Sequence, residues 1–427
     1  MEETMPSPIS PEIWPARDYS RVPYRLYHDA ALYEEEQKKI FRGPVWFVLG
    51  FEAEVPNVGD YRATQIGDTP VVFSRNEDGT VRAFVNRCAH RGAEVVRYPS
   101  GNAKDFTCIY HAWCYKLDGD LVGVPFRRGA NGAGGMPKEF NLKDHNLTKI
   151  RVRIWKGIVF GTYAAEGEVE DLETYLGPLM CEHVGDLMRK PIKILGYQRQ
   201  RVAANWKLYH ENIRDAYHGS LLHEFNRTFG MSRLTQVAGG YMDDKHRHSI
   251  LFQYAGSDSD EVARAAYAEN GVQRGDYMTL NDYGITRHFV ENKLGISTRI
   301  ISVFPNIFFH QIYNTLAMRQ LRTLGPGEFE LVWTLFGYED DTPELTQHRL
   351  NQANMVGPAG LISMEDGEAL EMVQRSTQPD TDKAGVVEMG GIGEIRSLDT
   401  RAQEVTIRGF WAYYSQLMGL EPAGAQR

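Results

Sequence analysis

The sequence predicts an α+β protein in which a small all-β domain precedes a larger domain built on an antiparallel β-sheet surrounded by helices. The chain has 427 residues, enough for two domains. Short apolar runs separated by Asp-Gly turns fill the stretch before residue 163, whereas the later residues mix helical and strand patterns. We therefore expect an N-terminal arm and helix over residues 1–43, packed on the larger domain, the β domain over 44–163, and the larger domain over 164–427.

Composition limits the class of protein. Hydrophobic residues make up 42% of the chain and aromatic residues 11%, which is typical of a folded globular protein and not of a disordered one. A net charge of −9 argues against general binding to nucleic acid or anionic membranes. Four cysteines suggest a reducing compartment or a metal site. Since neither a signal peptide nor a membrane span is recognisable, we expect a bacterial cytoplasmic protein.

The elements of the first half follow from caps and turns. The first 24 residues are rich in proline, which predicts an extended arm. A helix is expected from Asp29 to about Phe41, because Asp29 can cap its first turn and two lysines fall in its last turn. In the β domain, strands at 71–73 and 81–85 flank Asn-Glu-Asp-Gly at 76–79, which predicts a hairpin.

The second half combines helices and antiparallel strands. We expect a helix over residues 205–223 and strands over 300–304, 307–312 and 329–336, the first two joined by a Pro-Asn turn. The chain ends in a predicted amphipathic helix whose apolar face carries Phe410, Trp411, Tyr414, Leu417 and Met418.

Two cysteines and two histidines form the first candidate metal site. Cys88 and His90 make a Cys-x-His pair, and Cys108 and His111 make a Cys-x-x-His pair, each in a predicted hairpin loop. This ligand set fits zinc or a Rieske [2Fe–2S] cluster, in which thiolates hold one iron and imidazoles the other. Zinc usually has about two to four residues between its first ligands and pairs like with like. The single-residue spacer and the mixed loops therefore favour the cluster.

Two histidines five residues apart form the second candidate site. His218 and His223 belong to a run that reads as helix. A non-haem Fe(II) site needs two histidines and one carboxylate on one side of the metal, with other positions open for oxygen. Five residues of regular helix turn the second ring about 140° from the first, so we expect the helix to loosen or break near Gly219 and Ser220. Asp215 precedes His218 by three residues and can orient that ring.

The motifs around both sites resemble those of Rieske non-haem iron aromatic-ring-hydroxylating oxygenases, in particular their large (α) subunits. The resemblance rests on Cys-x-His-Arg-Gly at 88–92, the Cys-x-x-His at 108–111, the run 205–223 and the Gly-Pro-Ala-Gly segment at 357–360. It implies a Rieske all-β domain followed by a catalytic domain of the helix-grip (START/Bet v 1-like) type.

The resemblance also implies how the iron is held. His218 and His223 would bind the mononuclear Fe(II), and Asp366, which follows the Gly-Pro-Ala-Gly segment, would be the third ligand. Glu365 and Glu368 are the main competitors for that place.

Asp215 would bridge His218 to the Rieske ligand His111 of a neighbouring subunit, which implies an oligomer. We expect an α3β3 or α3 assembly, with a small β subunit in the first case. Because the sequence contains no flavin or nicotinamide motif, a separate reductase, and a ferredoxin with it, would supply the electrons.

Within the family, the resemblance is to large subunits of the terephthalate, anthranilate and salicylate types, and it spans nearly the whole chain. It implies an aromatic carboxylate substrate that reacts with O2 by cis-dihydroxylation or monohydroxylation. A buried carboxylate needs a cation, and arginine binds it through two hydrogen bonds. Arg319 and Arg408 match arginines of the terephthalate-type enzymes, with a structural salt bridge as the alternative for each.

Three other functions stay open from the sequence. An aryl-acetate or indole-acetate hydroxylase would use the same carboxylate anchor. An electron carrier would have the Rieske cluster without a catalytic iron, and a zinc-stabilised binding module would have neither.

Overall fold

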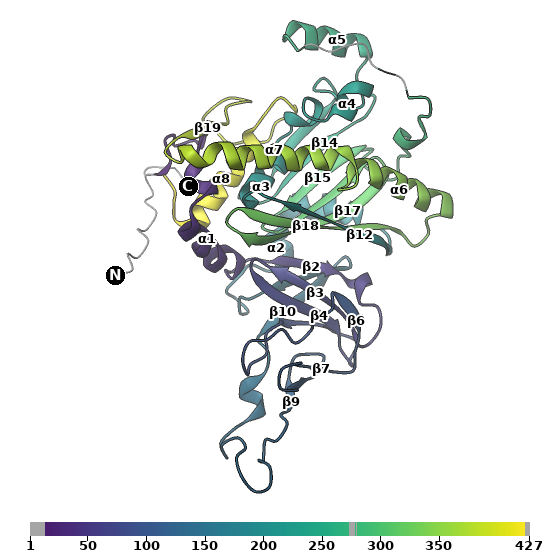
Figure 1. The fold of residues 1–427 in the computed structure, drawn as a ribbon. Helices are drawn as coiled ribbons and strands as arrows, with labels where there is room; N and C mark the ends of the chain where they lie inside the picture. The colour runs from purple at the N-terminus through teal and green to yellow at the C-terminus, as the bar shows by residue number, and fades with distance from the viewer. Residues whose placement is uncertain (1–12, 273–277, 279, 423–427) are drawn as a thin grey trace. The chain divides into compact units, whose positions relative to one another are not determined.

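The computed structural model describes residues 13–272, 278 and 280–422, and it divides into two compact units. One unit comprises residues 41–172, and the other combines the segment up to residue 40 with the chain from residue 173 onward (Figure 1). The first twelve residues of the expected N-terminal arm lie outside the described part. No helix in the described chain has the length and apolarity that crossing a membrane requires.

The unit of residues 41–172 is all-β, as predicted. Its larger sheet is antiparallel, with the strand order β2 (Phe47–Phe51), β11 (Ile158–Thr162), β10 (Lys149–Trp155), β5 (Val81–Val85), β4 (Thr69–Arg75), β3 (Asp60–Ile66), β6 (Ser100–Asn102). A smaller sheet contains β7 (Phe106–Thr107), β8 (Cys114–Tyr115) and β9 (Leu121–Gly123). The predicted hairpin is confirmed: β4 pairs with β5, and Gly79 takes the positive φ of 78° that the turn requires.

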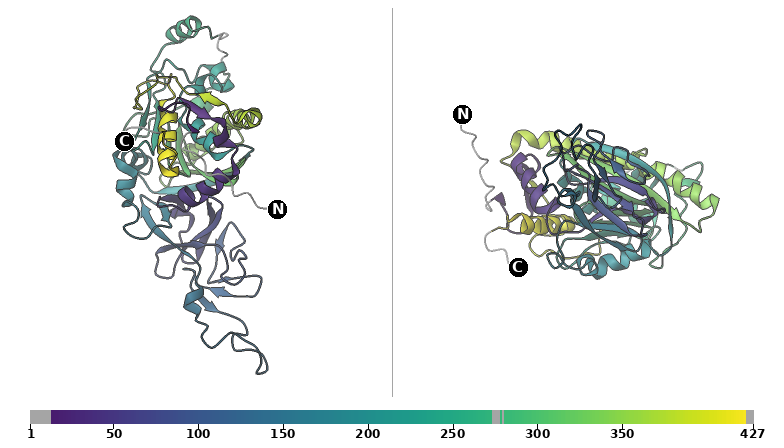
Figure 2. Two further views of the ribbon diagram at one scale, coloured as in Figure 1. Left: turned by 90° about the vertical axis from the view of Figure 1, so that its left-hand side faces the viewer. Right: turned by 90° about the horizontal axis from the view of Figure 1, so that it is seen from below.

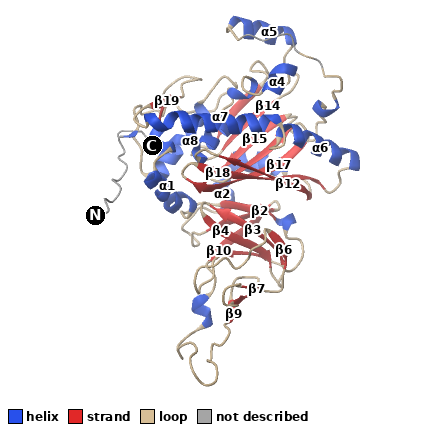
Figure 3. Ribbon diagram, in the orientation of Figure 1, coloured by secondary structure: helices blue, strands red, loops and turns tan. Residues whose placement is uncertain are grey.

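The second unit is built on a seven-stranded antiparallel sheet. Its order is β12 (Ile192–Val202), β18 (Glu328–Tyr338), β17 (Thr315–Gly325), β16 (Ile307–Ile312), β15 (Thr298–Val303), β14 (Ser249–Gln253), β13 (Ala238–Met242). The predicted strands after residue 300 are thus confirmed, with β15 and β18 starting slightly earlier than expected. The α+β fold class is confirmed as well (Figure 3).

Helices cover both faces of this sheet. Helix α2 (Leu172–Leu187) lies on one face, where Asp186 accepts a hydrogen bond from the buried Arg299 of β15 at 2.6 Å. Helices α3 (Trp206–Arg214) and α7 (Leu361–Thr377) lie on the other face; Arg319 of β17 reaches α3, and Gln200 of β12 donates to α7 at 2.8 Å. The same unit also contains α4 (Glu224–Phe229), α5 (Asp260–Glu269), α6 (Pro343–Val356), α8 (Val405–Met418) and the pair β1 (Arg21–Pro23) and β19 (Ala384–Val386).

The N-terminal helix packs beside the C-terminal one (Figure 1, Figure 2). Helix α1 (Ala30–Glu36) begins at Asp29, whose side chain accepts from two backbone N–H groups as predicted, and a π-helical turn continues it to Phe41. Buried Glu36 then accepts hydrogen bonds from Lys207 of α3 at 2.6 Å and from Tyr414 of α8 at 2.6 Å. Helix α8 is less amphipathic than predicted, because it is buried on almost all sides.

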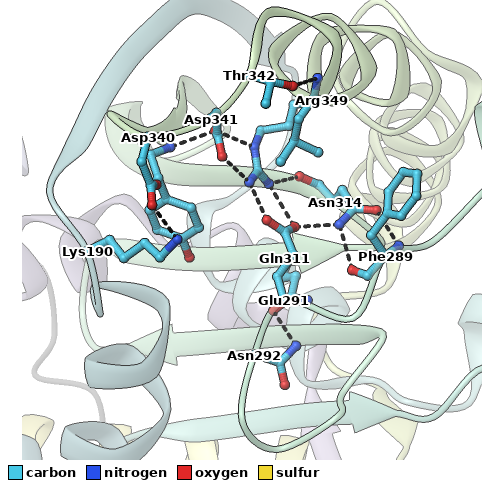
Figure 4. A network of polar contacts seen from close by, with 12 residues as sticks. Lys190, Phe289, Glu291, Asn292, Gln311, Asn314, Asp340, Asp341, Thr342 and Arg349 are labelled. Carbon is cyan, nitrogen blue, oxygen red and sulfur yellow. Dashed lines mark hydrogen bonds and ion pairs between the residues drawn. The ribbon is translucent and has the colours of Figure 1, made fainter.

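A polar network attaches α6 to the sheet (Figure 4). Its centre is Arg349, whose side chain is 1% exposed. The guanidinium donates to Asp341 at 2.8 and 2.9 Å, to Glu291 at 2.5 and 3.0 Å, and to the carbonyl of Asn314 at 2.6 Å. These two carboxylates and the carbonyl satisfy this buried cation completely.

Candidate metal centres and the cavity between sheet and helix

The four predicted cluster ligands lie on two loops of the all-β unit. Cys88 and His90 follow β5, and Cys108 and His111 lie between β7 and β8. Both cysteines are buried and both histidines are exposed. The imidazole ring centroids are 4.5 Å apart. The thiols therefore gather on the inner side and the imidazoles on the outer side, which is the separation of ligand types that a Rieske cluster requires.

Two neighbouring side chains support this loop pair. The Tyr115 hydroxyl lies 3.2 Å from the Cys88 sulfur and accepts the backbone N–H of Ala89 at 3.1 Å. His90 stacks on Trp113, with ring centroids 4.9 Å apart and planes within 7°. Hydrogen bonds at the sulfurs and burial are the means by which a protein adjusts the potential of such a cluster.

The helix that carries the second site ends earlier than expected. Helix α3 stops at Arg214, whereas we expected helix to residue 223 with a break near Gly219 and Ser220. The side chain of Asp215 accepts the backbone N–H groups of Tyr217 at 2.7 Å and His218 at 3.2 Å. This local turn competes with the helical hydrogen bonds and ends the helix. His218 then begins a 3-10 turn, and His223 is the N-cap of α4.

The break brings three metal-binding side chains together. The Nε2 atoms of His218 and His223 lie 3.4 and 3.6 Å from the same oxygen of Asp366, which α7 supplies. One ligand atom from each residue lies within 4.8 Å of the other two. Two imidazoles and one carboxylate on one side of a common point are the ligand set of a non-haem Fe(II) site.

A carboxylate lies behind each imidazole. Asp215 is 3.2 Å from Nδ1 of His218, and Glu365 is 3.0 Å from Nδ1 of His223. Such contacts orient a ligand ring and leave Nε2 for the metal. Of the two competitors of Asp366, Glu365 thus lies on the far side of His223, and Glu368 is exposed. The Asp366 carboxylate also accepts from the Asn212 amide at 3.0 Å.

Charge at this site favours a cation. Although burial alone would lower it, the carboxylates of Asp215 and Asp366 raise the pKa of His218 to about 10. Burial opposes ionisation of Asp366, yet the two histidines hold the pKa of its carboxyl below the ordinary value. The three side chains therefore fit a divalent metal ion such as Fe(II) in both geometry and charge.

A cavity opens beside the three ligands, between the sheet and helices α3 and α7. Its walls include the three ligands and apolar side chains suited to an aromatic ring: Leu251, Ile300, Ile312, Trp333, Val356 and Ile362. Arg319 also lines it. The Arg319 guanidinium donates to the Tyr209 hydroxyl at 2.8 Å and lies 4.7 Å from the centroid of the Trp333 ring. Within the described chain, its Nε and Nη2 atoms have no hydrogen-bond partner.

The structure separates the two arginines that the sequence offered as substrate anchors. Arg408 is buried in α8, and it is not among the described residues that line the cavity. The carboxylates that act on its charge are those of Asp18, Glu404 and Glu388. Of these two arginines, Arg319 is therefore the one that is placed to meet a molecule beside the metal ligands.

Arg401 and His310 are among the polar residues of the cavity that the sequence analysis did not anticipate. Arg401 lines it from the loop before α8, and its hydrogen bonds go to Ser232, Gln253 and a backbone carbonyl, all neutral. His310 lines it from β16, on the same face of the sheet as Arg319. The sequence signal for His310 was its place in the predicted strand 307–312, where the two-residue period decides which side chains share a face.

An iron–sulfur ligand set in one unit and a mononuclear iron ligand set beside a cavity in the other define an iron-dependent redox enzyme. The family comparisons agree with this class. Residues 45–139 match the Rieske [2Fe-2S] domain, and residues 183–419 match the ring hydroxylating alpha subunit (catalytic domain). The chain belongs to the family of Rieske ring-hydroxylating oxygenase α subunits. It is thus an oxidoreductase that carries a [2Fe–2S] cluster and a mononuclear non-haem Fe(II), which confirms the resemblance seen in the sequence.

The chain is similar over nearly its whole length to several members of this family. It is 46% identical to the anthranilate 1,2-dioxygenase large subunit of Burkholderia cepacia, over 95% of each chain. It is 41% identical to the terminal oxygenase component subunit alpha 2 of terephthalate 1,2-dioxygenase from Comamonas sp., over 96% of this chain and 98% of that one. The large oxygenase component of salicylate 5-hydroxylase from Ralstonia sp. is 40% identical, over 95% and 96%.

A solved structure supports the fold. Naphthalene 1,2-dioxygenase from Rhodococcus sp., crystallised with indole, superposes with a TM-score of 0.75 over 93% of this chain and 94% of that one, at 22% sequence identity.

Proposed function

We propose that the protein is the terminal oxygenase component that hydroxylates the ring of an aromatic carboxylate, a benzoate-type acid, with O2. The observation that carries this proposal is Arg319, a buried cation in the cavity beside His218, His223 and Asp366, two of whose nitrogens have no hydrogen-bond partner among the described residues. A ligand carboxylate would accept the hydrogen bonds that the protein leaves unmade. The similar proteins named for anthranilate, terephthalate and salicylate support the same substrate class.

The residue roles follow from the two ligand sets. Cys88, His90, Cys108 and His111 hold the cluster, and His218, His223 and Asp366 hold the iron. When bound there, the cluster supplies electrons one at a time, and the iron supplies an open site for oxygen activation. Glu365 orients His223, and the apolar walls exclude water and hold the ring.

Asp215 is the proposed link between the centres. It contacts Nδ1 of His218 at 3.2 Å, and in an oligomer it would also reach His111 of a neighbouring copy of the chain. We expect Asp215→Ala to keep both metal centres largely filled and to lose nearly all turnover, as measured by metal analysis and product formation. Asp215→Asn is the matched control for shape, because its amide oxygen can still accept the two backbone N–H groups. Normal turnover in either variant would contradict the proposed bridge.

The proposed partners are electron-transfer proteins and further subunits of an oligomer. Electrons would come from a separate reductase that uses NAD(P)H, with a ferredoxin between them, in the bacterial cytoplasm. We propose a trimer of this chain, as α3 or, with a small β subunit, α3β3.

A single turnover tests the proposed reaction. The purified protein, with both metal centres filled and chemically reduced, is mixed with isotopically heavy O2 and one compound from a panel of benzoate-type acids, aryl-acetates and matched neutral amides. We expect heavy oxygen in the product of a benzoate-type acid, and one or two heavy atoms would distinguish monohydroxylation from cis-dihydroxylation. A product from aryl-acetates or indole-acetate alone would favour that alternative, and products from the neutral amides alone would contradict the carboxylate anchor.

A further inference from the structure

The backbone that carries His218 is a short turn between two helices. After α3 ends, a 3-10 turn comprises the three residues His218–Ser220, and α4 begins at Glu224. A 3-10 turn has poorer hydrogen-bond geometry than an α-helix, and a single helical turn is not stable by itself. The position of the His218 ring must therefore depend on contacts that other segments make with this turn.

One of these contacts comes from Tyr267. The side chain of Ser220 is fully buried, and the hydroxyl of Tyr267 donates a hydrogen bond to its Oγ at 3.0 Å. The same tyrosine hydroxyl accepts the backbone N–H of Leu234 at 3.0 Å. Because a backbone N–H can only donate, the proton of the hydroxyl is left for Ser220. Tyr267 thus joins the turn of His218 to the segment that contains Leu234.

Tyr267 belongs to a helix that the pairing of the strands does not require. Strands β14 and β15 are antiparallel neighbours, which a two-residue turn can join, yet an excursion of residues 254–297 separates them. Long connections often carry function. Helix α5 lies within this excursion at the periphery of the unit (Figure 1), and its two buried residues are Ala263 and Tyr267. The buried side of α5 therefore reaches the turn of His218.

We propose that Tyr267 is a positioning residue for the mononuclear iron, because its hydrogen bond to Ser220 fixes the turn that begins at His218. In this shape the turn directs Nε2 of His218 toward the other two ligands. Groups that orient a metal ligand without touching the metal alter the metal affinity when they are removed. This inference rests on the proposed function, since it takes His218 as an iron ligand. Helix α5 thereby supports the iron, although none of its residues, all of which the structure describes, lines the cavity.

Two substitutions remove this hydrogen bond from opposite ends. Tyr267→Phe keeps the ring, which belongs to a residue only 4% exposed, and removes the hydroxyl, whereas Ser220→Ala removes the acceptor. The matched control is Tyr283→Phe, the same change at an exposed tyrosine of the same excursion. Because both substitutions act on one hydrogen bond, the double variant should lose little more iron affinity than either single variant.

Iron binding and spectroscopy test the proposal. Protein that retains the cluster but lacks the mononuclear iron is titrated with ferrous iron in the absence of oxygen, and nitric oxide is then added as a spectroscopic probe. We expect Tyr267→Phe and Ser220→Ala each to raise the dissociation constant for iron by about 3- to 10-fold, the value of one neutral hydrogen bond. The paramagnetic resonance spectrum of the iron–nitrosyl complex should change in both variants, and the visible spectrum of the cluster should not. Tyr283→Phe should match wild type.

The outcomes separate this inference from the proposed function. If Tyr267→Phe lowered the melting temperature of the iron-free protein but left the iron affinity and the nitrosyl spectrum unchanged, Tyr267 would merely pack α5, and the inference would be wrong. Additive losses in the double variant would also contradict it. If His218→Ala bound iron as tightly as wild type, the ligand assignment itself would fail. Should Tyr267→Phe not fold, Ser220→Ala, which keeps the tyrosine, decides by the same criteria.

Discussion

Two buried arginines of the same sheet-based unit differ in the groups that contact their guanidinium. Arg349 has two carboxylates and a backbone carbonyl around its guanidinium (Figure 4). Arg319 has one neutral hydroxyl and the face of an indole, although its residue is only 3% exposed. A paired buried cation holds elements together, since removing it leaves its partners uncompensated. An unpaired one beside a metal site costs stability, and a ligand of opposite charge removes that cost.

The largest effect is expected at the metal ligands, which define the cavity that Arg319 faces. His218→Ala or Asp366→Ala should lose the mononuclear iron and with it all measurable turnover, while the red-brown colour of the cluster persists. Glu368→Ala, an exposed carboxylate on the same helix as Asp366, is the matched control. Iron content and visible spectra provide the measurement. Loss of colour together with the iron would mean that the two sites are wrongly assigned.

The next largest effect is expected where the cation is paired. Arg349→Met leaves Asp341 and Glu291 without their shared partner and should destabilise the protein by about 3–5 kcal/mol. Arg349→Lys, which keeps the charge but not the paired donors, should lose less. Thermal unfolding measures both variants. An unchanged melting temperature in Arg349→Met would contradict the claim that the paired cation of Arg349 stabilises the fold.

Arg319→Met is expected to leave the stability unchanged or to raise it slightly, in contrast to the destabilisation expected for Arg349→Met. The substitution gives up one hydrogen bond to Tyr209 and the contact with Trp333, and it removes an uncompensated buried charge. We therefore expect the melting temperature of the ligand-free variant to equal or exceed that of wild type. Its free energy of unfolding should differ from that of wild type by no more than about 1 kcal/mol. A fall as large as that of Arg349→Met would show that Arg319 is structural.

The smallest effect, a change in the affinity for benzoate, is expected at Arg408. This arginine tests whether a buried cation must also lie beside the metal ligands in order to bind a carboxylate. Its guanidinium nitrogens also have no hydrogen-bond partner among the described residues, yet it does not line the cavity. Arg408→Gln should leave the dissociation constant for benzoate within about 2-fold of wild type, because position beside the metal ligands, and not the lack of a partner alone, makes an arginine an anchor. A loss of tenfold or more would restore Arg408 as an anchor.

The candidate metal ligands could be recognised in the sequence, whereas the surroundings of these residues could not be predicted from it. The Cys/His motifs and the run around His218 are defined by residue types and by short spacings along the chain. Both can be recognised in the sequence without a structure. The end of α3 was missed because residues 205–223 have helical composition throughout, while the decisive interaction is a side-chain turn at Asp215. Likewise, the sequence could not distinguish Arg319 from Arg408 as the carboxylate anchor, because only the packed structure shows which of them faces the cavity.

The central claim is that Arg319 binds the carboxylate of the substrate. The most direct test compares the binding of benzoate and of benzamide, its neutral isostere, to wild type and to Arg319→Met. Both proteins carry their full complement of metal, and the dissociation constants are measured by calorimetry. We expect wild type to prefer benzoate by about 30-fold or more, the smaller end of the range for a buried charge pair, and Arg319→Met to lose that preference. A preference that survived the substitution undiminished would place the carboxylate elsewhere and contradict the account.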